Sequence, residues 1–121
     1  MIIGDVKETF AEASKLFASH PLAFVSFDLD YYSSTVSALK IFSENELPRI
    51  WCFFDDLGQL SNLAGEQLAI DEYNSSLFGT KSISKVALLP EMLPSWAVWA
   101  SSMHIHHDFS HSKYASCIQE A

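Results

Sequence analysis

The sequence predicts an α/β fold in which parallel strands are flanked by helices and followed by a C-terminal antiparallel hairpin. Helix-like and strand-like segments alternate over residues 6–77, and this alternation implies crossover connections between parallel strands. The first two strand-like segments are almost continuously apolar, as is typical of strands that helices cover on both faces. At 121 residues the chain is expected to form a single domain, 1–121.

The first half of the chain contains two expected helices and one expected strand. Apolar residues at helical spacing predict a helix over 6–18, which ends before Pro21 because the residue preceding a proline avoids helical backbone. The apolar run LAFVSF predicts a strand over 22–27. Ser33 or Ser34 is expected to cap the next helix, which runs to about residue 43.

The second half begins with another apolar strand, expected over 50–54. Ser61 or Asn62 is expected to cap a third helix that ends at about residue 77. Residues 84–89 and 96–106 then have the pattern of two strands, with two prolines between them and no helical segment. This pair is therefore expected to be an antiparallel hairpin.

The composition excludes several classes of partner. Seven basic and fifteen acidic residues give a net charge of −8, which argues against binding to a nucleic-acid backbone. The 49% hydrophobic content excludes a disordered chain, and no apolar run approaches membrane-spanning length. Cys52 and Cys117 lie far apart and outside any CxxC pattern, so they indicate ordinary thiols in a reducing compartment. We therefore expect a cytoplasmic protein without nucleic-acid or membrane partners.

Acidic residues follow both apolar strands. The first strand ends in Asp28-Leu29-Asp30 and the second ends in Asp55-Asp56. Parallel strands would bring these carboxylates to one edge of the sheet, where open α/β folds bind ligands. Their mutual repulsion favours a bound hard cation such as Mg²⁺. The alternative is that each aspartate only turns the chain or caps a helix.

The residues around this acidic group resemble a known family. The stretch 27–35 (FDLDYYSST), followed by a strand that ends in Asp55-Asp56, resembles the macrocin-type O-methyltransferases. These are class I enzymes that use S-adenosylmethionine to methylate hydroxyl groups, often on sugars of natural products. Residues 4–9 and 65–73 are similar to the segments that flank the same strands in the family, and 107–114 are weakly similar to its C-terminal end.

The resemblance implies a role for each residue of the motif. Asp30 would be the proton acceptor or would support the metal ligands, and Asp28 and Asp30 could exchange these roles. Tyr31 and Tyr32 would line the substrate pocket, although adjacent tyrosines also serve as packing residues. The carboxylates implied to bind Mg²⁺ or a similar divalent cation are Asp28, Asp55 and Asp56.

One departure from the family is large. Class I methyltransferases begin with a strand and a Gly-rich turn that receives the cofactor, and this sequence has no Gly-x-Gly pattern. The chain thus corresponds to the C-terminal half of the family domain, a partial Rossmann-like fold, and is expected to be inactive as this fragment. The strand 22–28 would then lack a neighbour, and exposed edges of this kind attract other strands. We expect a homo-oligomer or a partner chain at that edge.

Two other classes of function remain open. A haloacid dehalogenase-type phosphatase also places DxD after a strand, but the 27-residue interval from Asp28 to Asp55 leaves no room for its usual insertions. A non-catalytic interaction module with a vestigial site is the stronger alternative. The histidines at 104, 106, 107 and 111 favour surface or hairpin positions over a metal site, because strand alternation separates His107 from His104 and His106.

Overall fold

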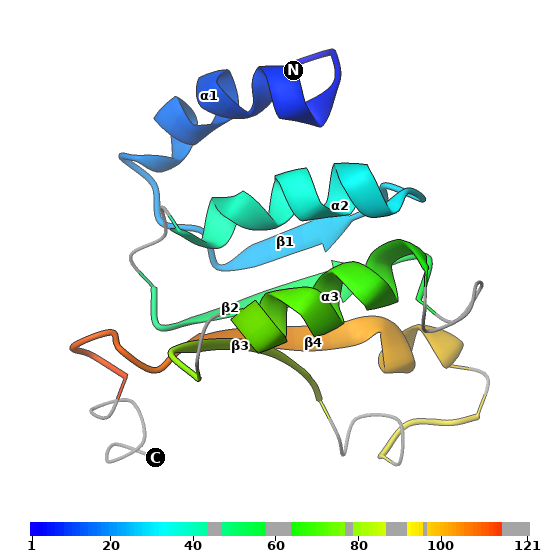
Figure 1. The fold of residues 1–121 in the computed structure, drawn as a ribbon. Helices are drawn as coiled ribbons and strands as arrows, with labels where there is room; N and C mark the ends of the chain where they lie inside the picture. Colours follow the sequence, from blue (N-terminus) through cyan, green and yellow to red (C-terminus); the bar gives the residue numbers. More distant parts are fainter. Residues whose placement is uncertain (44–46, 58–63, 77–78, 87–91, 96, 115–121) are drawn as a thin grey trace.

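The chain folds into alternating helices and strands that end in two antiparallel strands (Figure 1). The computed structural model describes residues 1–43, 47–57, 64–76, 79–86, 92–95 and 97–114. No helix in these ranges is long and apolar enough to cross a membrane. The elements are α1 (Val6–Phe17), β1 (Phe24–Phe27), α2 (Tyr32–Ala38), the 3₁₀ helix η1 (Leu39–Ser43), β2 (Arg49–Phe54), α3 (Gly65–Ser76), β3 (Lys81–Lys85), the 3₁₀ helix η2 (Val98–Ser102) and β4 (Met103–Asp108).

The four strands form one mixed sheet in the order β1-β2-β4-β3. β1 and β2 are parallel, and Phe27 lies opposite Phe54. β4 is antiparallel to both of its neighbours, β2 and β3. The α/β class and the antiparallel C-terminal pair are thus confirmed. Only one of the three strand pairs is parallel.

α1 starts where the sequence predicts, whereas α2 starts before the predicted capping residues. α1 lies where expected, and the Asp5 side chain caps it by accepting from the Lys7 N–H at 2.8 Å. α2 begins at Tyr32, because the Tyr31 carbonyl already accepts the first helical hydrogen bond from the Thr35 N–H at 3.0 Å. The expected caps at 33 and 34 were therefore wrong, and those at 61 and 62 lie outside the described residues.

The C-terminal hairpin has different bounds from those expected. β3 begins three residues earlier than predicted, at Lys81, and residues 87–90 lie outside the described ranges. The second strand was predicted over 96–106, but a 3₁₀ turn occupies 98–102 and β4 covers 103–108. Hydrogen bonds from the Ala97 N–H to the Pro94 carbonyl and from the Ala100 N–H to the Ala97 carbonyl curl this segment. Apolar composition alone does not distinguish such a turn from a strand.

α2 and α3 pack side by side on one face of the sheet (Figure 1). The core forms between these helices and that face, and its Phe27 and Phe54 rings stack at 4.6 Å. Within the described residues, no helix packs on the opposite face, so the expectation that helices cover both faces is not met there. The buried core residues are Phe27, Leu39, Phe42, Ile50, Cys52, Phe54, Ala69, Ile70 and Ile83.

Two histidines belong to this core. Of the expected surface or hairpin positions, His104 and His106 take the hairpin position, on β4, where both point to the covered face and are buried. The His106 ring stacks on Phe42 at 4.0 Å, and its Nε2 shares a 2.9 Å hydrogen bond with the Tyr73 hydroxyl. Burial lowers the pKa of His106 to about 4. His106 is therefore neutral at pH 7, and burial lowers the pKa of His104 as well.

In the described part of the chain, few residues cover the other face of the sheet and the outer edge of β1. Phe24 and Trp51 lie opposite each other on this face and are 54% and 45% exposed. Ile105 continues the row on β4. α1 lies beyond β1 and contacts α2, but none of its residues is buried, and a groove of about 280 Å³ separates it from β1 and α2.

The buried His106 is expected to make stability depend on pH. Folding lowers its pKa from 6.5 to about 4, so the unfolded chain binds the proton more tightly between these values. The free energy of unfolding should therefore fall by up to about 3 kcal/mol as the pH drops from 6.5 to 4. Urea unfolding at a series of pH values in this range should show that the free energy of unfolding changes less with pH in His106→Gln than in wild type. His20→Gln, at an exposed turn, is the control. Parallel pH profiles for wild type and His106→Gln would contradict this assignment.

The exposed row and the open β1 edge are expected to cause self-association or partner binding. Exposed aromatic rows next to an unpaired edge associate because pairing buries apolar surface and satisfies backbone groups. Light scattering should give a mass above 13.5 kDa for the chain. Phe24→Lys combined with Trp51→Lys should shift it toward monomer, whereas Leu16→Lys, at an exposed apolar residue of α1, should not. A monodisperse wild-type monomer with a cooperative melt would refute the expectation.

Candidate metal centre

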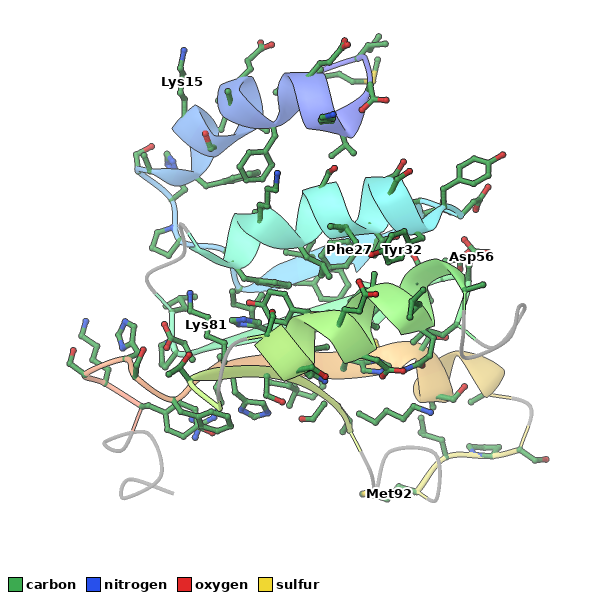
Figure 2. All side chains as sticks on the ribbon, viewed as in Figure 1. Lys15, Phe27, Tyr32, Asp56, Lys81 and Met92 are labelled. Carbon is green, nitrogen blue, oxygen red and sulfur yellow. The ribbon has the colours of Figure 1, made fainter. Side chains whose placement is uncertain are left out.

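Three carboxylates meet at the carboxyl ends of β1 and β2. Because Phe27 and Phe54 are in register in parallel strands, Asp28 and Asp55 leave the sheet at the same edge. The Asp55 N–H donates to the Phe27 carbonyl at 3.0 Å and extends the pairing by one residue. Carboxylate oxygens of Asp28, Asp55 and Asp56 lie within 4.8 Å of one another. Figure 2 shows Asp56 beyond the end of β2. The convergence expected from the sequence is thus observed.

Asp30 joins this group through Asp56. Its backbone has φ = 50°, in the left-handed region that non-glycine residues rarely occupy. This conformation returns the chain toward β2, so that the side chain and the N–H of Asp30 lie close to the Asp56 carboxylate. The side-chain contact with Asp30 raises the pKa of Asp56, as do burial and the charges of Asp30 and Asp55. The cluster therefore resists carrying full negative charge.

The donor set suits a hard divalent cation. All donors are carboxylate oxygens, which Mg²⁺ and Mn²⁺ prefer. The Asp56 Oδ2 atom is buried and has no hydrogen-bond partner among the described residues. Such an atom is costly unless something compensates it. A cation between Asp28, Asp55 and Asp56 would supply that compensation and offset their repulsion.

Glu66 is a further acidic residue at this edge, and sequence reasoning assigned it no role. It lies in the first turn of α3 and is 2% exposed. Its Oε2 accepts a hydrogen bond from the Asp56 N–H at 3.1 Å. Burial raises the pKa of Glu66 to about 7. An acid in the first turn of a helix normally indicates only a favourable helix-dipole contact at the surface, so the sequence gives little sign of its burial.

The two tyrosines of the motif differ in environment. Tyr31 is 73% exposed beside the acidic cluster. The Tyr32 hydroxyl donates to the Glu72 carboxylate and so ties α2 to α3. Their proposed contact with a substrate remains a prediction.

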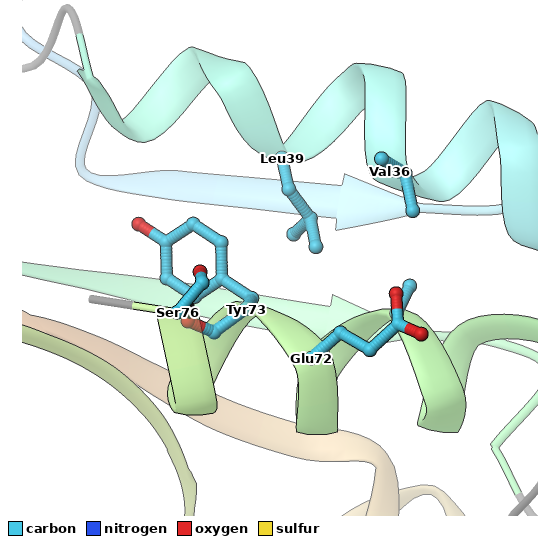
Figure 3. Close-up of a pocket in the computed structure, with 6 residues that line it drawn as sticks. Val36, Leu39, Glu72, Tyr73 and Ser76 are labelled. Carbon is cyan, nitrogen blue, oxygen red and sulfur yellow. Dashed lines mark hydrogen bonds between the residues drawn. The ribbon is translucent and has the colours of Figure 1, made fainter. Parts of the chain in front are cut away.

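A pocket of about 230 Å³ lies between α2 and α3 (Figure 3). It contains none of the clustered aspartates, and its walls are mostly apolar. Its one charged group, the Glu72 carboxylate, is already bonded by Tyr32. The pocket is therefore a gap in helix packing, separate from the acidic edge. Its lining residues are Val36, Leu39, Ala69, Glu72, Tyr73 and Ser76.

The other candidate side chains lie in different surroundings. Cys52 is fully buried, and burial raises the pKa of its thiol to about 12, in line with the ordinary thiol expected. Cys117 lies outside the described residues. Arg49, at the start of β2, lies 4.3 Å from the centre of the Tyr114 ring. Among the described residues, the only His, Cys, Asp and Glu side chains grouped closely enough to hold a metal are Asp28, Asp55 and Asp56.

A substitution that removes the charge of one ligand should distinguish the repulsion within the cluster from its binding of a metal. Asp55→Asn removes repulsion from Asp28 and Asp56, so the metal-free protein should melt slightly higher than wild type. Mn²⁺ at 100 times its Kd should stabilise wild type by about 2.7 kcal/mol, roughly 10 °C in melting temperature. Asp55→Asn should lose most of this rise.

The matched control is Asp71→Asn, which removes one exposed aspartate from α3. It should keep the full response to Mn²⁺. Differential scanning calorimetry with and without Mn²⁺ makes the comparison. An equal Mn²⁺ response in wild type and Asp55→Asn would remove Asp55 from the metal site.

Comparison with known proteins leaves the family of this chain open. Protein-family models, curated proteins and solved structures gave no significant match. The functional interpretation therefore rests on the acidic cluster and on the motif that forms it.

Proposed function

We propose that this chain is the metal-binding, C-terminal half of an S-adenosylmethionine-dependent O-methyltransferase that acts on a small-molecule hydroxyl, on a sugar or another natural product. The observation that carries the proposal is the convergence of the Asp28, Asp55 and Asp56 carboxylates within 4.8 Å. The motif over 27–35 supplies the first of these residues. The parallel β1-β2 pair, followed by an antiparallel pair, supports a partial Rossmann-like fold.

The acidic residues have separate roles in this proposal. Asp28, Asp55 and Asp56 hold the cation. A bound hard divalent ion lowers the pKa of a substrate hydroxyl that coordinates it. Asp30 lies outside this triad but contacts Asp56, so its carboxylate is placed to accept the hydroxyl proton. Asp28 and Asp30 can exchange these two roles, because they leave the same turn.

The substrate side is assigned to the exposed surface beside the cluster. Tyr31 offers a large ring and a hydroxyl to an acceptor that approaches the carboxylates. Tyr32 holds the start of α2 against α3 through Glu72 and lines the same approach. The sequence has no Gly-x-Gly turn, so no methyl-donor site is assigned to residues of this chain and no transfer step is derived. The open edge of β1 is the position where a cofactor-binding half would add its strand.

Calorimetry tests the proposal in two stages. The first titrates Mn²⁺ into the chain, and one ion per chain is expected for wild type, with none for Asp28→Asn. The second titrates S-adenosylmethionine into the Mn²⁺-loaded chain and into the product of the reading frame extended upstream of Met1. Cofactor binding and methyl transfer are expected only when a Gly-rich segment is present.

Three outcomes would contradict the proposal. Absence of Mn²⁺ binding to wild type would favour a non-catalytic module with a vestigial site. An extended product that contains a Gly-rich turn but does not bind S-adenosylmethionine would exclude the methyltransferase. Steady hydrolysis of an aryl phosphate with Mg²⁺, lost in Asp28→Asn, would favour a phosphatase.

A further inference from the structure

We infer that Glu66 is a positioning residue that holds the two acid-bearing turns in the arrangement that binds the cation. The inference rests on the proposed metal site and adds to it a residue from a third element, α3. Glu66 does not belong to the triad of candidate ligands. It acts through the backbone of the turns that carry those ligands.

One carboxylate lies against both turns. The Glu66 Oε2 atom accepts from the N–H of Asp56 at 3.1 Å, in the turn after β2. The N–H of Leu29, in the turn after β1, faces the same carboxylate and favours its charged form. Leu29 lies between Asp28 and Asp30, so this contact fixes the centre of the first acidic turn. Glu66 therefore links the two turns at a point beyond the last strand pair.

Simple packing does not account for an acid at this position. Glu66 is 2% exposed, and its Oε1 atom is buried with no partner among the described residues. The charges of Asp55 and Asp56 lie close enough to oppose its ionisation. An apolar side chain of similar size would avoid both penalties. An apolar side chain, however, could neither accept the Asp56 N–H nor attract the N–H of Leu29.

The contacts of Glu66 add to the hydrogen bond from the Asp55 N–H to the Phe27 carbonyl, which ends the β1-β2 pairing. Asp30 has a left-handed backbone, and the carboxylates of Asp28 and Asp55 are exposed. Without the contacts of Glu66, repulsion between the aspartates would favour separation of the turns. Residues that orient metal ligands through hydrogen bonds change metal affinity by about 10–100-fold when removed.

The test measures the Kd for Mn²⁺ by calorimetry in wild type and four variants. Glu66→Ala removes both contacts and should weaken Mn²⁺ binding by about 10–100-fold. Glu66→Gln keeps one carbonyl oxygen for the Asp56 N–H but places a donor toward Leu29, so its Kd should fall between those of wild type and Glu66→Ala. Asp71→Ala and Asp71→Asn are the matched controls on the same helix and should bind Mn²⁺ as wild type does.

A second measurement separates positioning from general support of the fold. Amide hydrogen exchange of metal-free protein, followed by NMR, should show a protected N–H group at Asp56 in wild type. In Glu66→Ala, exchange should accelerate at this amide while the β2 and β4 amides keep their protection. In Glu66→Gln the acceleration should be smaller, because the amide oxygen still accepts this N–H. If Glu66→Ala does not fold, Glu66→Gln carries both measurements.

The outcomes distinguish this inference from the proposed function. If wild type binds no Mn²⁺, both the metal site and the role of Glu66 in it are overturned. If wild type binds Mn²⁺ and the folded Glu66 variants bind it within about twofold, the positioning role alone is overturned. If Glu66→Gln has a lower melting temperature but the same Mn²⁺ affinity and the same amide hydrogen exchange as wild type, Glu66 is a purely structural residue.

Discussion

The parallel pairing of β1 with β2 is the constraint on which the rest of the molecule depends. It sets Phe27 against Phe54 in the core and, one residue later, brings Asp28 and Asp55 to the same edge. Because side chains alternate along a strand, a shift of one residue would turn Phe27 away from the helices and separate the acids. Packing of the core and assembly of the candidate site are therefore fixed by the same register.

The acidic edge works against the stability that this register provides. Asp28, Asp30, Asp55 and Asp56 repel one another, and Glu66 adds a buried carboxyl beneath them. Sites prepared for a ligand often have such locally unfavourable electrostatics, which binding relieves. Here the hydrogen bond from the Asp56 N–H to Glu66, and the contact of Asp30 with Asp56, hold together groups that would otherwise separate.

Much of the fold could be predicted from periodicity, and so could the acidic edge. Alternating apolar segments gave the fold class and α1, and two strands that both end in aspartate gave the cluster. The uncovered sheet face could not be predicted, because Phe24 and Trp51 look like buried residues in a continuous apolar run. The burial of Glu66 depends on how α3 sits under two turns, and His106 is buried through contacts with Phe42 and Tyr73. These are properties of tertiary packing that single-sequence patterns do not contain.

The position of β4 has a consequence for the order in which the protein is made. β4 lies between β2 and β3 in the sheet, although it follows both in the sequence. During synthesis, β2 and β3 therefore lack the strand that pairs with both of them until residue 108 has left the ribosome. The buried histidines of β4, which complete the core, arrive at the same late stage. Folding of the sheet is thus completed after most of the chain has been translated, and chaperones that shield exposed strands have their main opportunity in that interval.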